Sequence, residues 1–159
     1  GKVDVTNLDP TPVFPFGHGL SYTTFERSDL RLSAPEVATD GAVDVTVRVT
    51  NTGDRAGADV VQLYVHDVVA PVTRPEVALV GFARVALEPG ESREVTFHLA
   101  ADRLAWVGQD LEWTVAPHRA ALSVGASAAD LGPTAHLTVT GPARTLGADR
   151  VLTTPVTVA

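Results

Sequence analysis

A strict alternation of valine with polar residues, in the segment 42–49, is the feature that most narrows the fold of this chain. The segment reads AVDVTVRV, with a valine at every second position. Successive side chains of a β-strand point to opposite faces, so a period of two indicates a strand with one buried face and one solvated face. The residues 51–54 that follow, NTGD, favour a turn, because asparagine and glycine tolerate positive φ. The chain is therefore expected to build sheets.

The rest of the chain repeats short apolar–polar alternations separated by turn residues. Proline and glycine in the segment 88–91 fit a tight turn, and a helical turn is expected only within residues 100–107. Because parallel strands need long crossover connections, usually helices, we expect antiparallel sheets. This predicts an all-β fold, an antiparallel β-sandwich of about seven strands, immunoglobulin-like or fibronectin type III-like, and the lack of cysteine favours the latter. The segments predicted as strands are 42–49, 59–66, 77–87, 93–99, 111–115, 119–125 and 135–139.

The same alternation predicts which side chains form the core. In the segment 93–99, the apolar residues at every second position are expected to point inward, and the glutamate and histidine between them are expected to point outward. Gly81 interrupts an otherwise regular strand, which indicates a β-bulge or a close crossing. The residues that we expect in the core are Val47, Val61, Leu63, Phe97 and Trp113.

Composition excludes several classes of partner. The net charge is −7, and the twelve lysines and arginines are scattered, which argues against nucleic acid. No apolar run reaches the roughly 18 residues of a membrane span. The chain begins at Gly1 and has no methionine, so we expect either a processed product or part of a longer one, with removal of an initiator methionine as the plainer alternative. Residues 2–9 show no signal-peptide pattern, and the compartment stays open between cytoplasmic and secreted in a bacterium.

No motif for catalysis, cofactor or metal stands out. The acidic residues lie in turns or on outward strand faces, unlike the facing pair of carboxylates that a glycosidase needs. The five histidines lack metal-ligand spacing, and the segment 17–22 completes neither a nucleophile elbow nor a dinucleotide fingerprint. We therefore predict no catalytic residue, no metal and no cofactor. His18, between two glycines, is better explained as a ring packed into an interface.

The two tryptophans are the remaining candidates for binding. Planar aromatic faces stack on the apolar faces of sugars. Trp113 shares the predicted inward face of its strand, so we assign it to the core. Trp106 follows the short helical turn, where it would be exposed and could contact a sugar. One aromatic alone makes a weak platform.

The segment 13–24 fits neither helix nor strand periodicity and reads VFPFGHGLSYTT. Together with four later blocks, it resembles the end of family 3 glycoside hydrolases, the bacterial and fungal β-glucosidases and β-xylosidases. The resemblance covers about residues 12–131. One departure occurs at residues 117–120, PHRA, where that family usually has Pro-Gly-x-Tyr. The four later blocks are VTNTGDRAGADVVQLYV, RPEVALVGFARVALEPGESREVTFHL, ADRLAWVGQDLEWTVAP and LSVGASAADL.

The resemblance implies a fibronectin type III-like domain that follows a barrel and an α/β sandwich domain. In that family the nucleophilic aspartate and the acid/base lie upstream of this kind of segment, and no position here matches either motif. The proline-, glycine- and aromatic-rich segment is then a bridge docked between the domains, with glycines for close backbone approach. The residues that the resemblance assigns to interdomain docking are Phe14, Phe16, Gly17, His18, Gly19, Leu20 and Tyr22.

These observations lead to a division of the chain and to two hypotheses. We expect an interdomain linker over residues 1–27, the sandwich over 28–131 and a C-terminal extension over 132–159. The first hypothesis is a non-catalytic C-terminal accessory domain that stabilises the catalytic domains of a β-glycosidase and could shape the cleft rim or the oligomer. The alternative is a free-standing carbohydrate-binding or adhesion module whose partner is an oligosaccharide.

Overall fold

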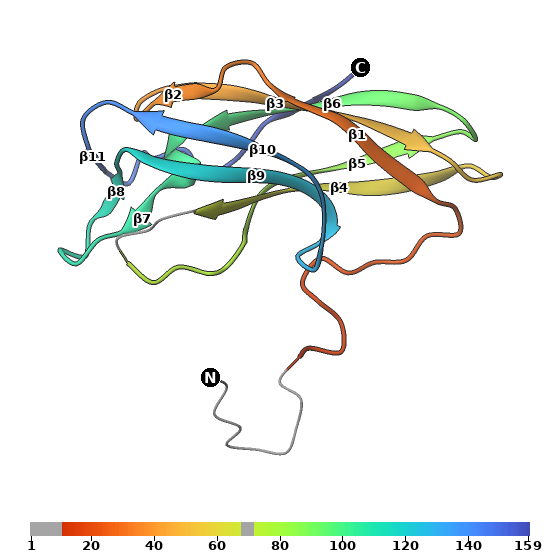
Figure 1. The fold of residues 1–159 in the computed structure, drawn as a ribbon, viewed down its shortest axis with the longest axis horizontal. Coiled ribbons are helices and arrows are strands. Elements are labelled where there is room, and N and C mark those ends of the chain that lie inside the picture. The colour runs from red at the N-terminus through yellow and green to blue at the C-terminus, as the bar shows by residue number, and fades with distance from the viewer. Residues whose placement is uncertain (1–10, 68–71) are drawn as a thin grey trace.

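The valine alternation forms the second strand of a four-stranded sheet. The computed structural model describes residues 11–67 and 72–159, so the first ten residues of the predicted linker lie outside it. Within this part, strand β3 (Ala42–Asn51) pairs with β1 (Phe25–Leu32) on one side and with β6 (Ser92–Ala100) on the other, and β12 (Val156–Val158) pairs with β6. The order is β1-β3-β6-β12. This sheet forms one layer of a β-sandwich (Figure 1).

The second layer is a five-stranded sheet in the order β2-β10-β9-β4-β5. Its pairs are antiparallel except that β2 runs parallel to β10, so the expectation of purely antiparallel sheets is wrong at this edge. No crossover helix is needed there, because most of the chain lies between these two strands. Three short strands, β11-β8-β7, form a further small sheet at one end. The remaining elements are β2 (Glu36–Ala38), β4 (Gly57–Asp67), β5 (Ala78–Leu87), a 3₁₀ turn (Ala101–Leu104), β7 (Trp106–Val107), β8 (Trp113–Val115), β9 (His118–Ser127), β10 (Asp130–Thr140) and β11 (Arg144–Leu146).

The core lies between the two main sheets and follows the predicted register. Val47, Val61, Leu63 and Phe97 are fully buried, which confirms their assignment to the core. The prediction that Trp113 belongs to the core is wrong, because this residue is 37% exposed. It lies on β8 in the small sheet rather than between the two layers, and Leu111 just before it has a φ of 65°, which marks a turn instead of a continuing strand.

Gly81 lies at the predicted bulge. The β4–β5 register shifts between Leu63, which faces Gly81, and Tyr64, which faces Leu79. A Cβ at Gly81 would approach the ring of Phe97 to 2.9 Å. Glycine is therefore required because the backbone of β5 lies directly against the buried ring of Phe97.

The C-terminal segment contributes strands to every sheet, so it is not a separate extension. The expected boundary at residue 131 falls inside β10, β11 pairs with β8, and β12 pairs with β6. On the outer face of the four-stranded sheet, His98 Nδ1 lies 2.7 Å from Asp44 Oδ1, and its Nε2 lies 2.9 Å from Thr157 Oγ1. These contacts hold β12 against β6 and β3.

A second clamp on this segment centres on Asp102. Its carboxylate accepts hydrogen bonds from the guanidinium of Arg144 and from the backbone N–H of Val151, the latter at 2.9 Å. Arg144 also donates to the carbonyl of Thr39 at 2.8 Å. Burial alone raises the pKa of Asp102, but the Val151 N–H and Arg144 outweigh it, and the net pKa lies below the ordinary value of 3.8.

We predict that Phe97→Ala lowers the free energy of unfolding by about 3–5 kcal/mol, because it leaves a cavity in the core. Val60 on the outer face of β4 is exposed, and Val60→Ala should change it by about 0.5 kcal/mol or less. Chemical denaturation of the isolated chain measures both. Equal losses would mean that the strand register differs from the one described.

A second prediction concerns Asp102 and pH. Because its folded pKa is depressed, its stabilisation is complete above the unfolded value of 3.8 and is lost as the pH falls through the lower folded value. The difference in unfolding free energy between the wild-type chain and Asp102→Asn should therefore be constant from pH 5 to 7, and should shrink below 3.8. A difference that grows on acidification would contradict this.

Candidate docking surface

The segment 13–24, which we call the strap, crosses the outer face of the sandwich before β1 begins (Figure 1). It contains no strand, as its irregular pattern predicts. Its large side chains are left open to solvent: Tyr22 is 94% exposed and Leu20 is 93% exposed. The other exposed apolar residues of the strap are Val13, Phe14 and Phe16. Such an apolar cluster on one segment is unusual for a solvated surface.

The strap is fixed to the sandwich by its backbone. Gln62 Nε2 donates to the carbonyl of Gly17 at 3.0 Å, and the N–H of Ala128 donates to the carbonyl of Phe16 at 2.9 Å. The hydroxyl of Tyr64 donates to Gln62 Oε1 at 2.7 Å and so orients the amide. Burial raises the pKa of Tyr64, which keeps this hydroxyl protonated as a donor. The backbone thus faces inward and the side chains face outward.

The two glycines of the strap have different roles. Gly17 has a φ of 80°, and a Cβ there would collide with the side chain of Gln62 and with the hydroxyl of Tyr64 at 2.5 Å. Gly19 has open space around it. The predicted need for close backbone approach therefore holds at Gly17, where the close neighbour is the sandwich itself. It does not hold at Gly19.

The far end of the strap is attached by threonines. Thr23 Oγ1 donates to Asn51 Oδ1 at 2.8 Å, and the hydroxyls of Thr24 and Thr52 lie 2.9 Å apart. Asn51 is fully buried and also donates to the carbonyl of Leu87. The strap is therefore held at both ends of its length, which limits the directions in which its exposed side chains can point.

His18 lies within the strap and not in a catalytic arrangement. Its ring stacks on that of Phe14, with centroids 5.1 Å apart and planes inclined by 27°. Its backbone N–H donates to the carbonyl of Pro15 at 3.0 Å, which closes a tight turn. Among the residues that the structure describes, no group of three His, Asp or Glu side chains is placed to hold a metal ion.

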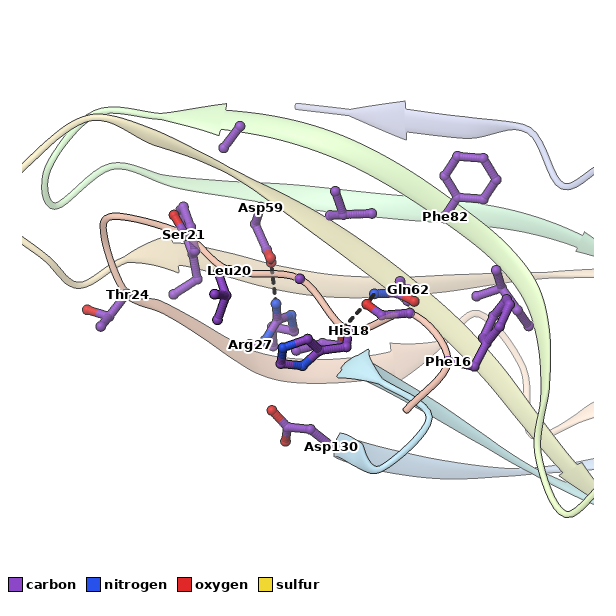
Figure 2. Close-up of a pocket in the computed structure, with 17 residues that line it drawn as sticks. Phe16, His18, Leu20, Ser21, Thr24, Arg27, Asp59, Gln62, Phe82 and Asp130 are labelled. Carbon is purple, nitrogen blue, oxygen red and sulfur yellow. Dashed lines mark hydrogen bonds and ion pairs between the residues drawn. The ribbon is translucent and has the colours of Figure 1, made fainter. Parts of the chain in front are cut away.

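A groove of about 660 Å³ lies between the strap and strands β1, β4 and β5 (Figure 2). The strap forms one wall. The outward-facing residues Val60, Leu79 and Phe82 line the side contributed by β4 and β5. Phe82 is 65% exposed. The sequence analysis did not identify Phe82 as a site residue. The signal was its position directly after the glycine of the β-bulge, because a bulge changes which residues of a strand point outward.

Two of the charged residues that line the groove, Arg27 and Asp59, form an ion pair, whereas the exposed Asp130 also lines it and forms no ion pair with the described residues. Arg27 Nη2 lies 2.5 Å from Asp59 Oδ1, and both side chains are largely buried. Burial raises the pKa of Asp59, and the attraction of Arg27 offsets only part of that effect. The pair therefore contributes little net charge to the groove, but Arg27 Nε and Asp59 Oδ2 are buried without a hydrogen-bond partner.

Trp106 differs from its expected exposure. It is buried, with 8% of its surface accessible. The ring of His118 meets it edge-on at 5.2 Å, and the guanidinium of Arg74 lies over it at 5.5 Å. Arg74 and His118 in turn contact Asp67, the latter at 3.1 Å. The tryptophan is covered by this cluster and has no free face for a sugar, which removes the evidence for the predicted sugar contact.

The fold and these residues define a fibronectin type III-like sandwich. Residues 59–128 match the family model of the fibronectin type III-like domain. A β-glucosidase structure from Erythrobacter marinus superposes with a TM-score of 0.78 and 37% sequence identity, over 84% of this chain and 18% of that one. The prediction of the fold class is thereby confirmed. Among the residues described, no helix is long and apolar enough to cross a membrane.

The relatives are enzymes much longer than this chain. A β-xylosidase of Formosa agariphila is 46% identical over 140 residues, which span 87% of this chain and 19% of that protein. A periplasmic β-glucosidase of Salmonella typhimurium is 42% identical over 118 residues, or 74% of this chain and 15% of that one. The chain belongs to the fibronectin type III-like domains of family 3 β-glucosidases and β-xylosidases, and it spans less than a fifth of these two relatives.

We predict that Gly17→Ala releases the strap while the sandwich stays folded, because the added methyl group meets Gln62 and forces a strained φ. The amide of Ala128, which is bonded to the strap, should then exchange its hydrogen faster, whereas Val124 in the core should be unchanged. Gly19→Ala is the matched control and should have no effect. A large fall in the unfolding midpoint would instead make the strap part of the sandwich core.

Proposed function

We propose that this chain is the non-catalytic accessory domain of a β-glycosidase, and that it stabilises the catalytic part by docking through the strap. The proposal rests on the orientation of the strap, which contacts the sandwich with its backbone and leaves its large apolar side chains exposed. Its backbone is hydrogen-bonded to the sandwich, while Leu20 and Tyr22 are almost completely exposed. Exposed apolar side chains of this kind are typical of a surface that another domain covers.

The lengths of the relatives support a partner within the same polypeptide. The β-xylosidase and the β-glucosidase named above each have more than four-fifths of their length outside the region that matches this chain. The chemistry of glycoside hydrolysis needs two facing carboxylates. These would come from that remaining part, and the proposal assigns none of them to the present chain. Either β-glucosides or β-xylosides remain candidate substrates of the whole enzyme.

A free-standing sugar-binding module has less support. That alternative rested on an exposed Trp106, and the ring is covered by Arg74 and His118. Phe14 and His18 are the only stacked pair of rings found in the described residues. The two rings stack on each other, so they do not form a two-ring platform for a sugar. We therefore do not propose it as a second function.

The test uses the full-length protein that contains this chain. Leu20→Ser together with Tyr22→Ser should leave the stability of the isolated chain nearly unchanged, because both side chains are exposed there. In the full-length enzyme we expect a loss of about 2–5 kcal/mol, because apolar area buried at the interface would be lost. Thermal inactivation of glycosidase activity measures it.

Leu111→Ser is the control for this experiment. Leu111 is also highly exposed, but it lies at the β7–β8 turn, at the opposite end of the sandwich from the start of β1 (Figure 1). The control should not change thermal inactivation. If the double variant inactivates at the wild-type rate, the strap is not a docking element and the proposal fails.

A further inference from the structure

The outer faces of the two sheets differ in chemistry. On the four-stranded sheet, outward-facing polar side chains are paired with one another: Arg31 with Glu94 at 2.8 Å, and the hydroxyls of Thr46 and Thr96 at 3.0 Å. This is a face suited to water. On the five-stranded sheet, the corresponding surface of β4 and β5 carries Phe82 and Val60, both exposed and apolar. The contrast within one molecule marks the β4–β5 face as the one that is incompletely covered.

The bulge in β5 creates this apolar face. The register shift between Leu79 and Gly81 places Val80 inside the sandwich, where it is 4% exposed, and allows both Leu79 and Phe82 to line the groove. A regular strand would place residues 79 and 82 on opposite faces. The carbonyl of Val80 accepts hydrogen bonds from Thr154 and Arg103, so the bulge is stabilised from the far side. The outward position of Phe82 is therefore built into the fold.

The polar groups of the groove are only partly satisfied within the chain. Arg27 and Asp59 are bound to each other, and the amide of Gln62 is used by the strap and by the carbonyl of Ala126. Arg27 Nε and Asp59 Oδ2 have no hydrogen-bond partner, and Asp130 lines the groove without an ion-pair partner among the described residues. An occupant therefore needs an apolar part against Phe82, Val60 and Leu79, and polar atoms on it would find partners in the groove.

We propose that Phe82, with Val60 and Leu79, is a second docking site, covered by an element of the same polypeptide outside this chain that presents apolar side chains to it. This rests on the proposed function and extends it from the strap to the sheet. The apolar wall is continuous with the strap residues Phe16 and Leu20, which line the same groove. The length of the relatives beyond the matched region supplies such an element. A groove of about 660 Å³ is large enough to receive several side chains of it.

The experiment compares Phe82→Ser with Phe16→Ser and Leu111→Ser in the full-length enzyme. We expect both groove variants to lose activity on heating on the order of tenfold faster than the wild type, as for a central interface aromatic. Leu111→Ser should match the wild type. In the isolated chain, none of the three should shift the unfolding midpoint by more than a few degrees, because all three side chains are exposed there.

The outcomes separate this inference from the function on which it rests. Faster inactivation with Phe16→Ser but not with Phe82→Ser overturns the second site and leaves strap docking intact. Wild-type behaviour of both variants overturns the second site, and strap docking is then decided by the Leu20→Ser, Tyr22→Ser double variant. A large fall in the isolated chain's midpoint with Phe82→Ser also overturns the inference, because the ring would then stabilise the domain itself.

Two further measurements on the isolated chain test other occupants. Chemical shifts around Phe82 are recorded while cellobiose or xylobiose is added to millimolar concentration. The molar mass in solution is measured for the wild type and for Phe82→Ser. No shift and a monomer in both cases support the proposal. Saturable shifts would make the groove a sugar site, and a dimer lost in the variant would make it a contact between two copies. Either result overturns the assignment.

Discussion

The hydrogen bond from Gln62 to the strap is the constraint on which the proposed docking surface depends. Gln62 points outward from β4, where an amide would ordinarily be solvated. Here it is buried, because the strap lies over it and supplies the carbonyl of Gly17 as an acceptor. Tyr64 holds the other end of the amide. Since the strap's backbone satisfies these groups, its large side chains are left exposed, and Phe16 and Leu20 among them line the groove.

Part of this arrangement could be predicted from the sequence. The alternation in residues 42–49 predicts β3 and its buried face, and Gly81 predicts the bulge, because both depend on local backbone geometry. The resemblance in residues 13–24 predicts a segment outside the sheets. Its attachment to the sandwich could not be foreseen, since Gln62 reads as an ordinary polar residue on an outward strand face. Tertiary contact, not local pattern, decides its role.

The errors have the same origin. Trp106 and Trp113 exchange their expected environments because periodicity does not say which strands belong to the main layers. β7 and β8 join a small third sheet with β11, a strand from the segment that the sequence predicts to be an extension. The burial of Trp106 depends on Arg74 and His118, which come from distant parts of the chain. Phe82 could not be identified from the sequence, because the register shift at the β-bulge determines on which face of β5 its side chain lies.

Tethering explains why a small apolar surface would suffice for docking. A domain joined to its partner by a short linker binds at an effective concentration of roughly millimolar, so about 4 kcal/mol makes it half docked and about 5.5 kcal/mol makes it mostly docked. Burial of two or three side chains such as Phe16, Leu20 and Phe82 supplies an amount of that order. Attachment of the strap to the sandwich at Gly17 and Thr23 shortens the free linker and raises the effective concentration further. The same bonds orient the apolar side chains before contact, which lowers the entropy lost on docking. A backbone-anchored strap is therefore a better docking element than a free one carrying the same aromatic residues.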